Sequence, residues 1–146
     1  MKNSILSLLL IIVLTSPILA QQELPKSEKP AMIATCFACH NPKAPSHDEI
    51  LAPPFAAVKF RYQMMYKTKE EFAQAVYDYV TNPTEEKALM FGAVRRFGVM
   101  PALPLPEEQI KSIAYYIYDN DVEAPEWFAE HFEEQHGKGG NRGFNH

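Results

Sequence analysis

The chain has 146 residues, of which 47% are hydrophobic and 22% are charged, so it suits one small domain and is short for a two-domain enzyme. Its formal net charge of -4 offers no basic field for a nucleic-acid backbone, and we expect no nucleic-acid binding. Cys36 and Cys39 are the only cysteines, which excludes a multi-disulfide scaffold and a four-cysteine zinc site.

Residues 1–20 have the pattern of a secretory signal peptide. Lys2 supplies a positive charge, an apolar run extends from Ile5 to Leu14, and Ala20 is a small residue suited to the cleavage point. The run is shorter than the roughly 20 apolar residues that cross a bilayer, so an uncleaved membrane anchor is the weaker alternative. We therefore predict a soluble, exported protein in an oxidising compartment, with no stable membrane insertion once the signal is removed.

The mature chain begins with a polar lead-in at residues 21–30, and a short apolar run follows. Prolines keep the stretch from residue 41 to residue 54 irregular. The first clearly periodic helix is predicted at residues 68–81, where Thr68 and Glu71 have the spacing of a capping box.

The chain beyond residue 81 alternates helical and extended segments. Asn82 is placed to cap a further short helix, whose apolar residues reach Val94. Prolines then force an extended segment, and residues 107–118 show the i, i+3, i+4, i+7 periodicity of an amphipathic helix. A last helix is predicted around residues 126–135, and the glycine-rich end at 137–146 is predicted to be disordered. No strand alternation is visible, so the sequence predicts an all-α fold.

The residues that carry chemistry are Cys36, Cys39 and His40. They form the C-x-x-C-H arrangement of c-type haem attachment, because two thiols at this spacing can each bond a haem vinyl group while the adjacent imidazole reaches the iron. A covalent tether keeps the cofactor in place even in a protein too small to enclose it. We therefore predict one haem c, with Cys36 and Cys39 as its thioether links and His40 as an axial ligand of the iron.

Three other interpretations of the cysteine pair remain open. A redox dithiol normally opens a helix in a strand-rich fold, which this sequence does not predict. A zinc site needs a second pair of ligands, and the remaining histidines do not supply one convincingly. A structural disulfide between Cys36 and Cys39 would close a very small loop and add little stability.

The second axial ligand is expected to be a methionine, because thioether sulfur favours reduced iron. Met100 is the best placed of the 6 methionines, since it follows Gly98 and precedes Pro101 on a segment that proline holds extended. A methionine on a helix more often fills the core. Met90 and His47 are the alternative ligands.

In this order the motifs resemble a class I cytochrome c. The matching features are the C-x-x-C-H motif, the Ala52-Pro53-Pro54 segment, the Gly-x-Met-Pro loop around Met100 and the closing amphipathic helix. The resemblance implies a small cytochrome c fold at residues 31–122, with several short helices packed around one covalently attached haem. It also implies that Pro54 gives a backbone hydrogen-bond acceptor to His40.

Two further features lie next to these motifs in the sequence, an arginine before the methionine loop and an extension after the closing helix. Arg95 and Arg96 precede the methionine loop and are candidate partners for the haem propionates, Arg96 being the one we select, with a solvated basic turn as the alternative. Residues 123–146 extend past the usual closing helix and carry Trp127, Phe128 and Phe132. This extension is expected to pack on the domain, with docking to a partner as the alternative.

Haem iron with both axial positions filled exchanges electrons and has no open position for oxygen or peroxide. We therefore expect a periplasmic one-electron carrier that shuttles between redox protein partners and has no catalytic activity of its own. Two alternatives remain open. One is a haem-based gas sensor or peroxidase-like protein with an open iron site, and the other is a haem subunit of a larger redox complex.

Overall fold

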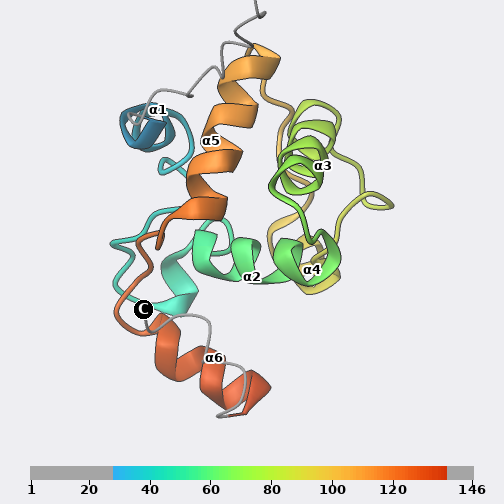
Figure 1. Cartoon of the computed structure of the whole chain (residues 1–146). Coiled ribbons are helices and arrows are strands. Elements are labelled where there is room, and N and C mark those ends of the chain that lie inside the picture. Colours follow the sequence, from blue (N-terminus) through green and yellow to red (C-terminus); the bar gives the residue numbers. More distant parts are fainter. Residues whose placement is uncertain (1–27, 138–146) are drawn as a thin grey trace, which may run out of the picture.

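The computed structural model describes residues 28–137, and these form an all-α fold without strands (Figure 1). This confirms the predicted fold class. Residues 1–20 and 138–146, predicted to be a signal peptide and part of a disordered end, lie outside the described residues. None of the described helices is long and apolar enough to span a membrane. The helices are α1 (Glu28–Thr35), α2 (Phe55–Met65), α3 (Lys69–Thr81), α4 (Phe91–Phe97), α5 (Glu107–Asp119) and α6 (Phe128–His136), with a single 3-10 turn at His47–Glu49.

Helix α1 begins inside the segment that was expected to be a polar lead-in. The lead-in was predicted to reach residue 30, but the helix starts at Glu28 and places Pro30 in its first turn. Proline is tolerated there because the first turn of a helix has no intrahelical partner for that backbone N–H. The predicted boundary was therefore a few residues late.

Helix α5 is the centre of the fold and runs between α1 and α3 (Figure 1). The predicted periodicity is confirmed, since Ile110, Ile113, Ala114 and Ile117 are all buried. The most extensive helix pairing in the described chain is that of α3 with α5. This pair forms one side of the core.

Helix α3 begins with the predicted capping box. The Thr68 hydroxyl accepts a hydrogen bond from the Glu71 backbone N–H at 3.2 Å, and the Glu71 carboxylate accepts one from the Thr68 N–H at 3.2 Å. Two backbone donors at the helix start are thereby satisfied. The helix ends at Thr81, as the following Asn82-Pro83 pair predicts.

The prediction of a short helix starting at Asn82 is wrong. Residues 85–87 form a turn, and the next helix, α4, does not begin until Phe91. Three consecutive residues, Ala88, Leu89 and Met90, all line the same cavity. Consecutive residues of a helix point about 100° apart, so an irregular segment is needed to turn all three inward.

Helix α2 was not predicted, because both of its faces are covered. One face carries Phe55 and Tyr62 into the main core, which also holds α5. The other carries Ala56 and Phe60 against α6. A helix that is apolar on two sides has no clear amphipathic period, so its helical signal in the sequence is weak.

Helix α6 forms the extension beyond the closing helix and packs on the outer side of α2 (Figure 1). Phe128 and Phe132 are each only 5% exposed and contact Ala56. The indole N–H of Trp127 donates to the Ala44 carbonyl at 2.9 Å, which ties the start of α6 to the loop before α2. The three aromatic side chains of the extension therefore serve the domain's own packing.

Candidate functional site

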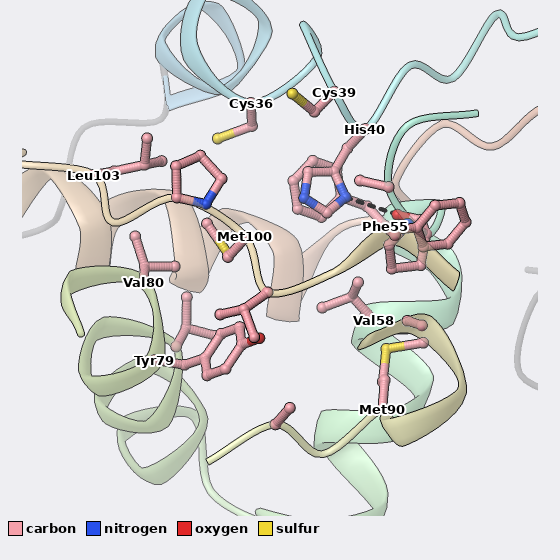
Figure 2. A pocket seen from close by; sticks show the side chains of 18 of the residues that line it. Cys36, Cys39, His40, Phe55, Val58, Tyr79, Val80, Met90, Met100 and Leu103 are labelled. Atoms are coloured by element: carbon pink, nitrogen blue, oxygen red, sulfur yellow. Dashed lines mark hydrogen bonds between the residues drawn. The ribbon is translucent and has the colours of Figure 1, made fainter. Parts of the chain in front are cut away.

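Four of the predicted haem-binding residues line one cavity in the middle of the fold (Figure 2). Its walls are mostly apolar and come from α2, α3, α4, α5 and the loops between them. Cys36, Cys39, His40 and Met100 all contribute to this lining. The structure thus brings the four residues together, although Met100 is far from the other three in the sequence.

A tight turn after α1 places both thiols at the cavity. The Cys36 N–H still bonds to the Met32 carbonyl at 2.8 Å, whereas the N–H groups of Cys39 and His40 fold back onto the Cys36 carbonyl at 3.2 and 3.0 Å. The two thiols are not bonded to each other. Burial raises the pKa of the Cys36 thiol to about 11, so this sulfur is held as a neutral thiol.

His40 is held in one tautomer by a backbone carbonyl. Its Nδ1 lies 2.7 Å from the Pro53 oxygen, and because a carbonyl only accepts, Nδ1 must carry the hydrogen. The lone pair is therefore on Nε2. Burial lowers the pKa of His40, with the Pro53 contact opposing this shift in part, so the neutral imidazole is favoured. This is the form in which a histidine binds a metal.

The acceptor for His40 is Pro53, so the assignment to Pro54 is corrected. The Pro54 carbonyl is used elsewhere, since it accepts the N–H groups of Ala57 and Val58 at 3.0 and 3.2 Å in the first turn of α2. Because Pro54 is the N-cap residue of α2, its carbonyl points along that helix. Sequence reasoning missed α2 and could not assign the two carbonyls.

Phe55 is a site residue that the sequence analysis also missed. Its ring is stacked on the His40 imidazole, with ring centroids 4.5 Å apart and planes 25° apart. Phe55, Val58 and Tyr62 share a face of α2 and line the cavity. Their i, i+3, i+7 spacing was the available signal.

Met100 reaches the cavity from an irregular loop after α4. Gly98 ends that helix with a φ of 79°, a conformation that glycine adopts without strain. Beyond Met100, the Leu103 N–H donates to the Val80 carbonyl at 3.0 Å and fastens the loop to α3. Figure 2 shows Met100 and His40 on separate segments, both directed into the cavity.

The two alternative ligands are placed differently. Met90, at the N-cap of α4, also lines the cavity (Figure 2), so it remains a possible source of sulfur. His47 does not line the cavity. Its ring contacts the Arg96 guanidinium, with Nη1 2.8 Å from His47 Nδ1.

Arg96 is held at the loop before α2 and does not line the cavity. Its Nη2 donates to the His47 carbonyl at 2.7 Å and to the Asp48 carboxylate at 3.2 Å. The expected pairing with haem propionates stays a prediction, and a propionate would have to share the guanidinium with these contacts. The guanidinium takes part in a tertiary contact between α4 and a distant loop. No local pattern in the sequence predicts this contact.

Two tyrosine hydroxyls form a polar feature in the otherwise apolar cavity. Tyr62 is 6% exposed, Tyr79 is half-buried, and both line the cavity. Burial raises the pKa of both phenols, so both stay protonated. Neither hydroxyl has a hydrogen-bond partner within residues 28–137. Because Tyr62 is buried, its unpaired hydroxyl is costly, and a bound group with an acceptor atom would satisfy it.

The described residues contain no group of three or more histidine, cysteine or acidic side chains arranged to hold a metal ion by themselves. The zinc interpretation of the cysteine pair therefore gains no support from this part of the chain. A haem differs, because its ring nitrogens supply most of the iron ligands and the protein adds only the axial ones.

Comparison with known proteins gives one informative match. A protein of Aquifex aeolicus (strain VF5), described as an uncharacterized protein, is 34% identical over 120 residues, covering 70% of this chain and 77% of the relative. The chain belongs to the same family as this Aquifex protein. No protein-family model matches the chain, and no solved structure matches it significantly.

Proposed function

We propose that this member of the Aquifex family is a periplasmic monohaem cytochrome c that carries one electron at a time. The observation that carries the proposal is the C-x-x-C-H turn itself. Both thiols and the imidazole of this turn line one apolar cavity, and the Pro53 carbonyl leaves Nε2 of His40 as the nitrogen with the lone pair. Covalent haem attachment needs this combination of groups.

The residues present fit a haem. The cavity offers a flat ligand mainly aliphatic and aromatic walls, two thiols for thioether links, and a neutral imidazole with a fixed tautomer. The thioether of Met100 lines the same cavity and supplies a second donor that suits iron. The unpaired hydroxyls of Tyr62 and Tyr79 are available to acceptor groups of the cofactor.

Each protein group has a defined task in this proposal. Cys36 and Cys39 would hold the cofactor through thioether links, while His40 and Met100 would bind its iron. The apolar walls exclude water, which together with the thioether ligand favours reduced iron. When bound, the haem supplies one-electron exchange at its iron.

A carrier follows from filling both axial positions, because no position is left for oxygen or peroxide. Its partners would be redox proteins that meet it in small, transient contacts. The periplasmic location rests on the sequence of residues 1–20. The alternative of a haem subunit in a larger complex would have to dock through other residues, since Phe128 and Phe132 are buried against α2.

One observation favours a second candidate, a gas sensor or peroxidase-like protein with open iron. Tyr62 and Tyr79 are tyrosines in the cavity lining, and hydrogen-bond donors beside an open iron position are what such proteins use. This candidate requires that Met100 stay off the iron. The axial ligand therefore decides between the two functions.

The test is the visible and near-infrared spectrum of protein produced with haem-attachment machinery. We compare the parent with Met100→Ala and, as the matched control in the same cavity, with Met90→Ala. The carrier predicts low-spin iron and a sulfur-to-iron band that is lost only in Met100→Ala. Loss of that band only in Met90→Ala would reassign the ligand, and high-spin iron in the parent would favour the open-iron candidate.

Covalent attachment is checked separately by mass. The denatured parent should keep one haem, and replacing both Cys36 and Cys39 with alanine should release it. A parent that never acquires covalent haem contradicts the proposed function whatever its fold.

A further inference from the structure

The turn that binds Nδ1 of His40 also supplies the ring that covers its face. Pro53 accepts the hydrogen bond at 2.7 Å, and Phe55, two residues later, stacks on the imidazole with centroids 4.5 Å apart and planes 25° apart (Figure 2). Both contacts therefore come from one short segment at the start of α2. The position of the His40 ring is therefore restrained by one short turn through two different contacts.

The two contacts restrain different motions of the imidazole. The hydrogen bond fixes the tautomer and the direction of the Nδ1–H bond, but it restrains a tilt of the ring plane only weakly, because a carbonyl oxygen accepts over a broad range of directions. A flat aromatic face at stacking distance limits that tilt, because tilting the imidazole would drive its atoms into the Phe55 ring. An aliphatic side chain of similar volume offers no such plane.

Phe55 is itself held rigidly enough to do this. It is 8% exposed, belongs to the main core, and occupies the first turn of α2. Phe37, from within the C-x-x-C-H motif, lies near it with ring centroids 6.0 Å apart. The position of the Phe55 ring is thus set by the fold and not by His40 alone.

We propose that Phe55 is a positioning residue that sets the plane of the His40 imidazole as an axial ligand. This inference rests on the proposed function, because it concerns the same iron ligand. In low-spin ferric haem, the distribution of the unpaired electron follows the planes of the axial ligands. The ring plane of His40 therefore has a signature that can be measured independently of electron-transfer activity.

The experiment compares four holo-proteins: the parent, Phe55→Leu, Phe55→Tyr and Phe128→Leu. Phe128→Leu is the matched control, since Phe128 is also buried and packs on Ala56 of the same helix turn, but it does not line the cavity. The readouts are the pattern of paramagnetically shifted haem-methyl proton signals and the ferric electron paramagnetic resonance spectrum.

We expect Phe55→Leu to change the order or spread of the haem-methyl signals, Phe55→Tyr to restore the parent pattern, and Phe128→Leu to retain it. The proposal is overturned if Phe55→Leu keeps the parent pattern, or if Phe128→Leu changes it equally. Should Phe55→Leu not fold, the parent decides through nuclear Overhauser contacts between the Phe55 and His40 rings, which must be present. Absence of covalent haem in the parent would instead count against the proposed function.

Discussion

The guanidinium of Arg96 donates to the backbone carbonyl of His47 at 2.7 Å and joins helix α4 to the loop before α2. The same loop meets the last helix, because the His47 ring lies against His131 of α6 with centroids 4.3 Å apart. Three segments that are distant in the sequence therefore converge at His47. One of them, α4, leads directly into the loop that carries Met100.

Replacing Arg96 with alanine should lower the free energy of unfolding. The substitution removes charge-assisted hydrogen bonds to the His47 carbonyl and the Asp48 carboxylate. Because the site is partly exposed, we expect a loss of about 1 kcal/mol, measured by urea unfolding.

The neighbouring Arg95→Ala variant is the matched control. Arg95 is exposed and has no such contact within residues 28–137, so its loss should change stability by no more than about 0.5 kcal/mol. Equal effects of the two substitutions would show that the Arg96 contacts contribute nothing.

Acidification should weaken the docking of α6 near His47. Burial, the Arg96 guanidinium and His131 lower the pKa of His47, while Asp48 opposes them. The undocked chain, with a histidine pKa of about 6.5, therefore takes up a proton before the docked chain does. Stability from this contact is complete at higher pH and falls as the pH drops below about 6.5 through the lowered pKa. The sole tryptophan, Trp127, lies beside His47 and reports the change by fluorescence.

The control for this pH effect is a histidine substitution in α6, the helix whose docking is being measured. His47→Gln should abolish the fluorescence change, whereas His136→Gln, at the exposed end of α6, should retain it. A change that survives in His47→Gln must come from another group.

The capping box of α3 should contribute measurably to stability. Thr68→Ala removes the hydroxyl that accepts the Glu71 N–H and should cost about 1 kcal/mol in the free energy of unfolding. Thr68→Ser keeps a hydroxyl at the same position and should recover most of the loss. If serine and alanine are equally destabilising, the methyl group of Thr68 matters and not the cap.

The second core, under α6, should be as sensitive as an ordinary protein interior. Phe132 is 5% exposed and meets Phe60 edge to face at 5.1 Å, so Phe132→Ala should cost about 3 kcal/mol in thermal or urea unfolding. Phe91, which is 56% exposed, provides the comparison, and Phe91→Ala should change stability by less than about 1 kcal/mol. A small effect at Phe132 would mean that α6 is not an integral part of the fold.

Features with a local signal were predictable from the sequence alone. The start of α3 follows from the three-residue spacing of Thr68 and Glu71, and the buried face of α5 follows from its apolar period. The chemistry-bearing residues Cys36, Cys39 and His40 are likewise adjacent in the chain. In each case the physical cause operates within one or two helical turns, so the residues themselves contain the information.

Only the tertiary structure decided which distant groups meet. The His40 partner is Pro53, 13 residues away, and Arg96 bonds to His47, 49 residues away. Helix α2 escaped prediction because α6 covers the face that would otherwise be polar. These contacts depend on how the helices pack around a shared core. Packing decides which of two neighbouring carbonyls or arginines makes the contact, and sequence spacing alone does not.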